Sequence, residues 1–165
     1  MTSGALKMSE LQLHEIHFIE DSDDEVFLAR MLLDGQNVDQ VIVHHTDLDS
    51  FCKTVQTTNA TGPIIVLVDL NLPGMKGDEV VKRIYRSCKR EKMFAGICTG
   101  SEDPADVQRA KEVGAQFYVS KPLNLQCLEK ICDANAAFKI NKTSPDKVGI
   151  FVNIERYLNS QHCTN

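Results

Sequence analysis

The apolar residues of the chain fall into two alternating kinds of segment. Short unbroken apolar runs, of which 64–68 is the clearest, are typical of strands buried on both faces of a parallel sheet. Between them, apolar residues recur every three to four positions, as on the buried face of a helix. The pattern predicts strands near residues 14–19, 41–45, 64–68, 94–98 and 116–119. It predicts helices that begin near residues 22, 47, 78, 104 and 124.

Residues that favour helix ends occur near the ends of the predicted helices. Ser22 or Asp23 can cap the first helix, and Gly35 suits the position that ends it. Pro104 fits the first turn of the fourth helix, which Gly114 would stop. Because strands alternate with helices and the connections are short, we predict an α/β fold. Its centre would be a doubly wound, five-stranded parallel sheet with helices on both faces.

The predicted sheet accounts for residues 13–137 and leaves a segment at each end. Residues 1–12 carry little pattern, so we expect a short N-terminal arm. Residues 138–165 form a C-terminal extension that begins as a polar linker. Within it, Ser144–Asp146 favours the start of a short helix, while Gly149 and the β-branched residues leave a strand as the alternative. We expect the extension to pack against its own core rather than to serve a partner.

Composition narrows the class of protein. The net charge of -5 argues against nucleic acid as a partner, because its backbone is bound by clustered Lys and Arg. No apolar run approaches the ~20 residues that span a bilayer, and the first ten residues lack the pattern of a signal peptide. We therefore expect a cytoplasmic protein without a membrane segment. The six cysteines lack metal-ligand spacing and fit reduced thiols better than a zinc site or a disulfide framework.

Polar side chains follow four of the predicted strands. The first strand is followed by Glu20 and Asp21, the third by Asp69, the fourth by Thr99 and the fifth by Lys121. Because parallel strands end at the same edge of a sheet, these side chains should share one pocket. Three close carboxylates repel one another, and a hard divalent cation such as Mg²⁺ would relieve that repulsion. Taken alone, each residue also fits an ordinary role as a turn former, a helix cap or a solvated charge.

Four short motifs, in this order, resemble the receiver domain of two-component response regulators. The type that they suggest is the single-domain one, similar to chemotaxis regulators and to the partners of phytochromes. The motifs are Phe18–Ser22, Val68–Gly77, Cys98–Gly100 and Tyr118–Pro122. The resemblance covers the whole predicted sheet and implies the flavodoxin-like strand order 2-1-3-4-5.

The resemblance implies a role for each matching acidic residue. Asp69 would be the phosphoacceptor, taking a phosphoryl group from the phosphohistidine of a histidine kinase or a histidine phosphotransfer protein. The cofactor would be Mg²⁺. Asp21 and Asp69 would bind it directly, Glu20 through water, and Asn71 through its backbone carbonyl.

The remaining motif residues would serve the phosphoryl group and the response to it. Thr99 and Lys121 would each bind a phosphoryl oxygen, and Tyr118 would turn inward as Thr99 moves. The resemblance also implies a cis peptide bond before Pro122, and Gly77 would help to turn the chain away from the site. The resulting surface change would reach a downstream protein, or drive self-association, through the fourth helix, fifth strand and fifth helix.

This interpretation makes the chain a phosphorylation switch rather than an enzyme, and two alternatives remain. A degenerate receiver would bind partners without phosphorylation, which the complete residue set argues against. An aspartate-nucleophile phosphohydrolase would need a second acid two residues after Asp69, where Asn71 stands. The residues do not name the kinase, its stimulus, the target, the oligomeric state or the acyl-phosphate lifetime.

Overall fold

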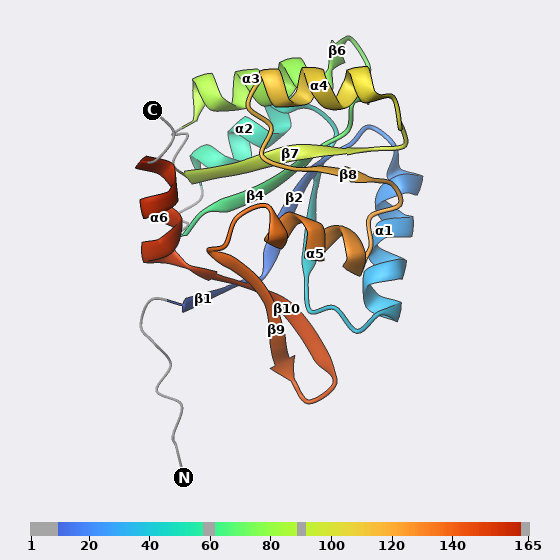
Figure 1. Cartoon of the computed structure of the whole chain (residues 1–165). Helices are drawn as coiled ribbons and strands as arrows, with labels where there is room; N and C mark the ends of the chain where they lie inside the picture. Colours follow the sequence, from blue (N-terminus) through green and yellow to red (C-terminus); the bar gives the residue numbers. More distant parts are fainter. Residues whose placement is uncertain (1–9, 58–61, 89–91, 163–165) are drawn as a thin grey trace.

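The sheet at the centre of the molecule has five parallel strands in the order β3-β2-β4-β7-β8 (Figure 1). The computed structural model describes residues 10–57, 62–88 and 92–162. The five strands are β2 (Glu15–Ile19), β3 (Val41–His45), β4 (Ile64–Val68), β7 (Met93–Thr99) and β8 (Tyr118–Ser120). Numbered along the chain within this sheet, their order is 2-1-3-4-5, which confirms the predicted fold. All five residues of β4 are buried, as its unbroken apolar run predicted.

Helices cover both faces of this sheet. On one face, α1 (Asp23–Gly35) and α5 (Leu125–Asp133) share a core with β2, β4 and β7. On the other face, a second core joins the sheet to α2 (Leu48–Gln56), α3 (Gly77–Ser87) and α4 (Pro104–Glu112). Every helix in the described part of the chain is too short or too polar to cross a membrane.

Side chains cap several helices near the predicted starts, whereas one predicted helix end was wrong. The side chains of Ser22, Asp47 and Asn124 each accept a backbone N–H of the helix that follows. Gly35, however, is the last residue of α1, so its prediction as the residue that ends the helix was wrong. Asn37 instead takes the left-handed conformation, with φ of 56°. Asn tolerates this conformation better than most residues, and the Val38 N–H then donates to the Leu33 carbonyl at 2.9 Å.

The two ends of the chain form a second, antiparallel sheet of three strands. Its order is β1-β10-β9, from β1 (Glu10–Leu13), β10 (Lys147–Asn153) and β9 (Phe138–Ser144). Residues 10–12 were therefore wrongly assigned to a patternless arm, and residues 1–9 lie outside the described residues. The predicted helix start at Ser144–Asp146 was also wrong, because this tripeptide turns the chain from β9 into β10. The β-branched residues favour strands here, and the helix α6 (Ile154–His162) begins only after β10.

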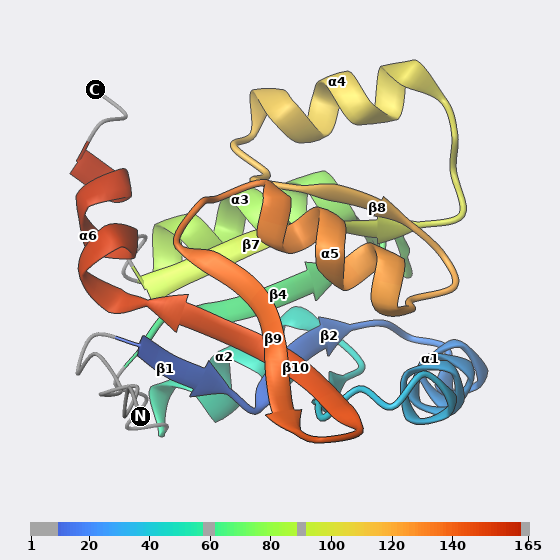
Figure 2. The ribbon, with the colours of Figure 1, turned by 60° about the horizontal axis from the view of Figure 1, so that its bottom comes forward.

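The antiparallel sheet packs on the core of the parallel sheet. The C-terminal extension was predicted to pack against its own core in this way. Phe138 at the start of β9 stacks on Phe94 at the start of β7, with ring centroids 4.6 Å apart. Tyr157 of α6 meets both rings edge to face. Figure 2 shows α6 beside the end of the parallel sheet from which β4 and β7 begin. The extension thus closes the end of the sheet that lies opposite the predicted site.

Hydrogen bonds also hold β10 to the loop between α1 and β3. The Asp39 N–H donates to the Val148 carbonyl at 2.7 Å, and the Val148 N–H donates to the Asn37 carbonyl at 3.0 Å. The Ile150 N–H donates to Gln40 Oε1 at 3.3 Å. The extension is therefore tied to this loop by backbone pairing as well as by apolar packing.

Candidate functional site

Three predicted site residues at the carboxyl edge of the parallel sheet each donate a backbone hydrogen bond to the neighbouring strand. The Asp69 N–H donates to the Ile19 carbonyl at 2.9 Å, and the Glu20 N–H donates to the His45 carbonyl at 2.9 Å. On the other side, the Lys121 N–H donates to the Thr99 carbonyl at 2.8 Å. These hydrogen bonds therefore fix the backbone positions of the three residues at the edge of the sheet.

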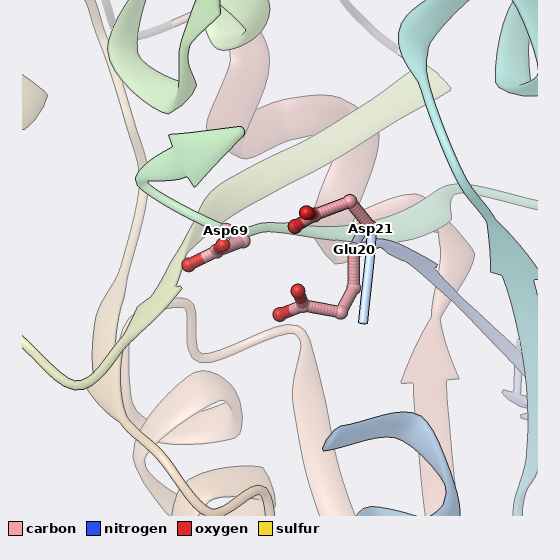
Figure 3. Close-up of side chains that lie close together, drawn as sticks. All are labelled: Glu20, Asp21 and Asp69. Atoms are coloured by element: carbon pink, nitrogen blue, oxygen red, sulfur yellow. The ribbon is translucent and has the colours of Figure 1, made fainter. Parts of the chain in front are cut away.

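Three carboxylates converge above this edge (Figure 3). One oxygen each of Glu20, Asp21 and Asp69 lies within 4.8 Å of the other two. Glu20 and Asp69 are buried, with exposed fractions of 1% and 5%, whereas Asp21 is exposed. The predicted convergence of these carboxylates is thus present in the structure, with an opening to solvent on the Asp21 side.

Lys121 supplies the positive charge that faces two of the carboxylates. Its Nζ lies 2.5 Å from Glu20 Oε2 and 3.2 Å from Asp69 Oδ1. Burial lowers the Lys121 pKa, but the hydrogen bond to Glu20 and the charges of Asp69 and Glu20 outweigh it, so the pKa is raised overall. The peptide bond between Lys121 and Pro122 is cis, as the resemblance implied.

Glu20 is buried beside a second carboxylate. Burial raises its pKa, while hydrogen bonds from Lys121 and from the Ser22 backbone N–H oppose the rise. The Ser22 N–H donates to Glu20 Oε1 at 3.1 Å. The nearby charge of Asp69 raises the Glu20 pKa further. A cation bound between these carboxylates would stabilise their ionised forms.

Thr99 and Tyr118 lie beside this cluster on β7 and β8. Thr99 is buried, with no exposed surface, and its hydroxyl accepts the Ser101 N–H at 3.3 Å. The Tyr118 hydroxyl donates to the Ser101 carbonyl at 3.2 Å. Both side chains therefore contact the start of the loop that leads from β7 into α4.

Asn71 and Gly77 flank Asp69 in a short hairpin of β5 (Asn71–Leu72) and β6 (Met75–Lys76). Asn71 is exposed and pairs with Lys76 across the hairpin. A Cβ atom at Gly77 would lie 2.3 Å from the Asp69 carbonyl oxygen and 2.7 Å from the Leu70 Cα. The chain can therefore return so close to Asp69 only because this residue is glycine.

The sequence interpretation missed the histidines beside the acidic pair. His44 Nε2 lies 2.6 Å from the Glu20 carbonyl oxygen, and its Nδ1 lies 3.7 Å from Asp23. Behind them, His17 and His45 stack with their rings 5.2 Å apart, joined by a hydrogen bond of 2.9 Å. The signal was present, because the strand 41–45 ends in two histidines at the same sheet edge.

The donor set fits a hard divalent cation. All three converging side chains offer carboxylate oxygens, which are the ligands that Mg²⁺ and similar cations prefer. The described His and Cys side chains do not join this cluster, so the donor set does not favour softer transition metals. The acidic pocket can thus hold a divalent cation, with its open side toward Asp21.

Comparison with known proteins shows which family the chain resembles. A family model of the response regulator receiver domain matches residues 16–133. The chain is 27% identical over 127 residues to the response regulator Rcp1 of Synechocystis sp., covering 74% of this chain and 86% of that protein. It is 36% identical over 83 residues to a cyclic di-GMP phosphodiesterase of Thermotoga maritima, covering 48% of this chain but 22% of that protein. The chain spans about half or less of the first curated relatives that it matches.

Solved structures show the same fold. The bacteriophytochrome response regulator AtBRR superposes with a TM-score of 0.66 at 23% identity, over 81% of this chain and 100% of that one. A Mn²⁺-bound form of Rcp1 superposes with a TM-score of 0.52 at 23% identity, over 74% of this chain and 89% of that one. Because the family model covers well over half of the chain, the protein belongs to the receiver-domain family of two-component response regulators.

Proposed function

We propose that Asp69 is a phosphoacceptor, charged by the phosphohistidine of a histidine kinase or a histidine phosphotransfer protein. The observation that carries this proposal is the placement of its carboxylate. Asp69 is buried at a strand end, 3.2 Å from the Lys121 ammonium and within 4.8 Å of the Glu20 and Asp21 oxygens. Phosphoryl transfer needs such positioning and charge neutralisation more than it needs acid or base chemistry.

The reaction exchanges one bond at phosphorus for another. An Asp69 carboxylate oxygen attacks the phosphorus atom, and the bond between phosphorus and the imidazole nitrogen breaks. The imidazole, whose other nitrogen carries a proton, leaves with that electron pair. An acyl phosphate on Asp69 and a neutral histidine on the partner result. Lys121 and the Thr99 hydroxyl would each contact one oxygen of the transferred group, and the Lys121 charge already lies beside Asp69.

The residues that would hold Mg²⁺ are Asp21 and Asp69 directly, Glu20 through water, and Asn71 through its backbone carbonyl. When bound, the ion would offset the negative charge of the phosphoryl oxygens. The chain's own part is to keep three carboxylates close together, which the buried positions of Glu20 and Asp69 accomplish. Because Asp21 is exposed, we expect the phosphohistidine to approach from its side of the cluster.

An apolar surface beside this opening supports a partner that docks on α1. Phe27, Leu28 and Met31 are exposed by 64%, 42% and 58%, although each is a large apolar side chain. They lie within three turns of Ser22, the residue that caps the start of α1 directly after the acidic pair. A partner helix could cover these side chains and bring its phosphohistidine to Asp69.

Phosphorylation would act on the loop between β7 and α4. Movement of Thr99 toward the phosphoryl group would change its contact with the Ser101 N–H, and Tyr118 shares that loop through the Ser101 carbonyl. We propose that α4, β8 and α5 carry the changed surface to a downstream protein or to a second copy of the chain.

Intact-mass spectrometry after incubation with Mg²⁺ and phosphoramidate tests this proposal. We expect the wild-type chain to gain the mass of one phosphoryl group. The Asp69→Asn variant should gain none, and the control Asp24→Asn, which changes an exposed acid of α1 outside the cluster, should react like the wild type.

Two results would overturn the proposal. An adduct that forms equally well with excess chelator would remove the role of the cation. Equal adduct in wild type and Asp69→Asn would place the reaction elsewhere. Failure of the wild type to react at all would favour the degenerate receiver, and turnover of varied phosphate esters would favour the hydrolase.

A further inference from the structure

A cavity of about 400 Å³ lies where the C-terminal extension meets the start of the parallel sheet. At this end of the molecule, α6 and the first residues of β7 lie side by side (Figure 1, Figure 2). The described lining comes from residues 134–137 at the end of α5, from Arg156, Ser160 and Gln161 of α6, and from Phe94 and Gln116.

Most of this cavity lies outside the part of the chain that the family model matches. The match ends at residue 133. Phe94 and Gln116 precede that residue, whereas the other seven of the nine described lining residues follow it. The cavity is therefore built mainly by the extension, and membership of the receiver-domain family gives it no role.

Arg156 alone carries a charge among the described residues that line the cavity. Its Nη1 donates to the Ala136 carbonyl at 3.4 Å, a long hydrogen bond that leaves most of the five guanidinium N–H groups for other acceptors. In the part of the chain that the structure describes, no carboxylate forms an ion pair with Arg156. The guanidinium can thus bind a carboxylate through two parallel hydrogen bonds.

A hydrogen-bonded wall joins the end of α5 to α6 beside Arg156. Asn135 Nδ2 donates to Ser160 Oγ at 3.0 Å, and Ser160 Oγ donates to the Tyr157 carbonyl at 2.6 Å. Asn135 Oδ1 accepts the Ala137 N–H at 2.9 Å. Because these polar side chains bind one another, the wall is formed before any ligand arrives, and Arg156 is the group that an anion would meet.

The rest of the lining is largely apolar. Ala134 and Ala136 are exposed at the end of α5, and Ala137 and Phe94 are buried beside them. An apolar group that covered these short side chains would remove apolar surface from water. The size of the cavity and its lining, apolar with a few polar groups, are those of small-molecule sites in proteins.

We propose that this cavity binds a small organic carboxylate, whose anionic group pairs with Arg156 and whose apolar body covers Ala134 and Ala136. The proposal rests on the cavity, on its single positive charge and on its apolar lining. It is independent of the chemistry at Asp69, which lies at the opposite edge of the sheet. Because the lining joins α5 to α6, a bound carboxylate would hold the extension to the core and raise the urea concentration at which the protein unfolds.

The test is to titrate the full-length, isotope-labelled protein with phenylacetate and to follow its backbone amides by two-dimensional NMR. We expect saturable shifts at residues 134–137 and 156–161, and none at Asp69 or Lys121. Phenylacetamide keeps the ring without the charge, and acetate keeps the charge without the ring. Each should bind more weakly than phenylacetate by about tenfold, because each loses one half of the recognition.

A pair of variants locates the anion. Arg156→Gln removes the charged hydrogen bonds and should weaken phenylacetate binding by about tenfold. Arg86→Gln makes the same change at an exposed position in the last turn of α3, away from the cavity, and should bind like the wild type.

The comparison of the three small molecules on the wild type keeps the test independent of the folding of any variant. The proposal is overturned if phenylacetamide or acetate binds as tightly as phenylacetate, if the shifts map elsewhere, or if millimolar phenylacetate causes no saturable shift. It is equally overturned if Arg156→Gln keeps the wild-type affinity, or if bound phenylacetate leaves the urea midpoint unchanged.

Discussion

The two ends of the parallel sheet are built from opposite chemistry. At the carboxyl edge, the Lys121 ammonium lies 2.5 Å from an oxygen of buried Glu20 and 3.2 Å from an oxygen of buried Asp69. At the amino edge, Phe94, Phe138 and Tyr157 form a buried aromatic cluster with the C-terminal extension. Buried charges cost free energy and are kept for function, whereas buried aromatic rings contribute stability directly. Substitutions at one end should therefore affect reactivity, and substitutions at the other should affect the free energy of unfolding.

The largest effect on stability should come from the aromatic end. We expect Phe138→Ala to lower the free energy of unfolding by about 4 kcal/mol, because it removes a 4%-exposed ring from between Phe94 and Tyr157. Urea unfolding measures the loss. Phe27→Ala makes the same change at a ring that is 64% exposed, and should cost less than about 1 kcal/mol. Equal losses in the two variants would show that the extension adds little to the core.

A second prediction concerns the protonation of His17 and His45, two buried histidines of the parallel sheet. Burial lowers the pKa of His17 and of His45 from 6.5 to about 4, and the nearby His17 adds to the effect at His45. Between these values the unfolded chain binds more protons than the folded one. The free energy of unfolding should therefore fall as the pH drops from about 6.5 toward 4, by about 3 kcal/mol per histidine.

Urea unfolding at a series of pH values checks this dependence. Glu20 contributes with the opposite sign, because burial raises its pKa, so the readout is a difference between variants. His17→Leu should flatten the pH profile by up to about 1.4 kcal/mol per pH unit, whereas His14→Gln, at an exposed position, should leave it unchanged. An unaltered profile in the His17 variant would show that these buried rings do not resist protonation.

Gly77 links stability to reactivity, because its lack of a side chain allows the backbone to pass close to Asp69. Its Cβ would clash with the backbone of Asp69 and Leu70, so we expect Gly77→Ala to cost about 2 kcal/mol and to slow formation of the phosphoryl adduct. Gly100→Ala is the matched control at the same sheet edge, since a Cβ there would meet no described atom within 4 Å. Similar behaviour of the two variants would argue against the tight approach at Asp69.

The two ends also differ in how well the sequence predicted them. The parallel sheet was predictable because its strands are continuous apolar runs and its helices carry ordinary caps, such as Ser22 and Asn124. The antiparallel sheet was not, because β1 and β10 are neighbours only through pairing across almost the whole chain. A local pattern of apolar residues does not indicate which distant strand is the pairing partner. In addition, Ser144–Asp146 suits a hairpin turn as well as a helix start.

The same distinction applies within the site. The positions of Glu20, Asp69, Thr99 and Lys121 follow from strand ends that meet at one edge, so their convergence was predictable. The sharing of Lys121 between two carboxylates depends on a side-chain conformation that the sequence does not encode locally.

The smallest expected change in stability belongs to the residue with the largest expected effect on function. Asp69→Asn removes the repulsion that raises the Glu20 pKa, but it also removes the attraction to Lys121 at 3.2 Å. These terms oppose each other, and Lys121 keeps its contact with Glu20 at 2.5 Å. We therefore expect the free energy of unfolding to change by less than about 1 kcal/mol in this variant, measured in urea, while the phosphoryl adduct is lost. A loss of several kcal/mol would instead mean that the charged edge is a structural element, and the contrast between the two ends would fail, because both would then hold the fold together.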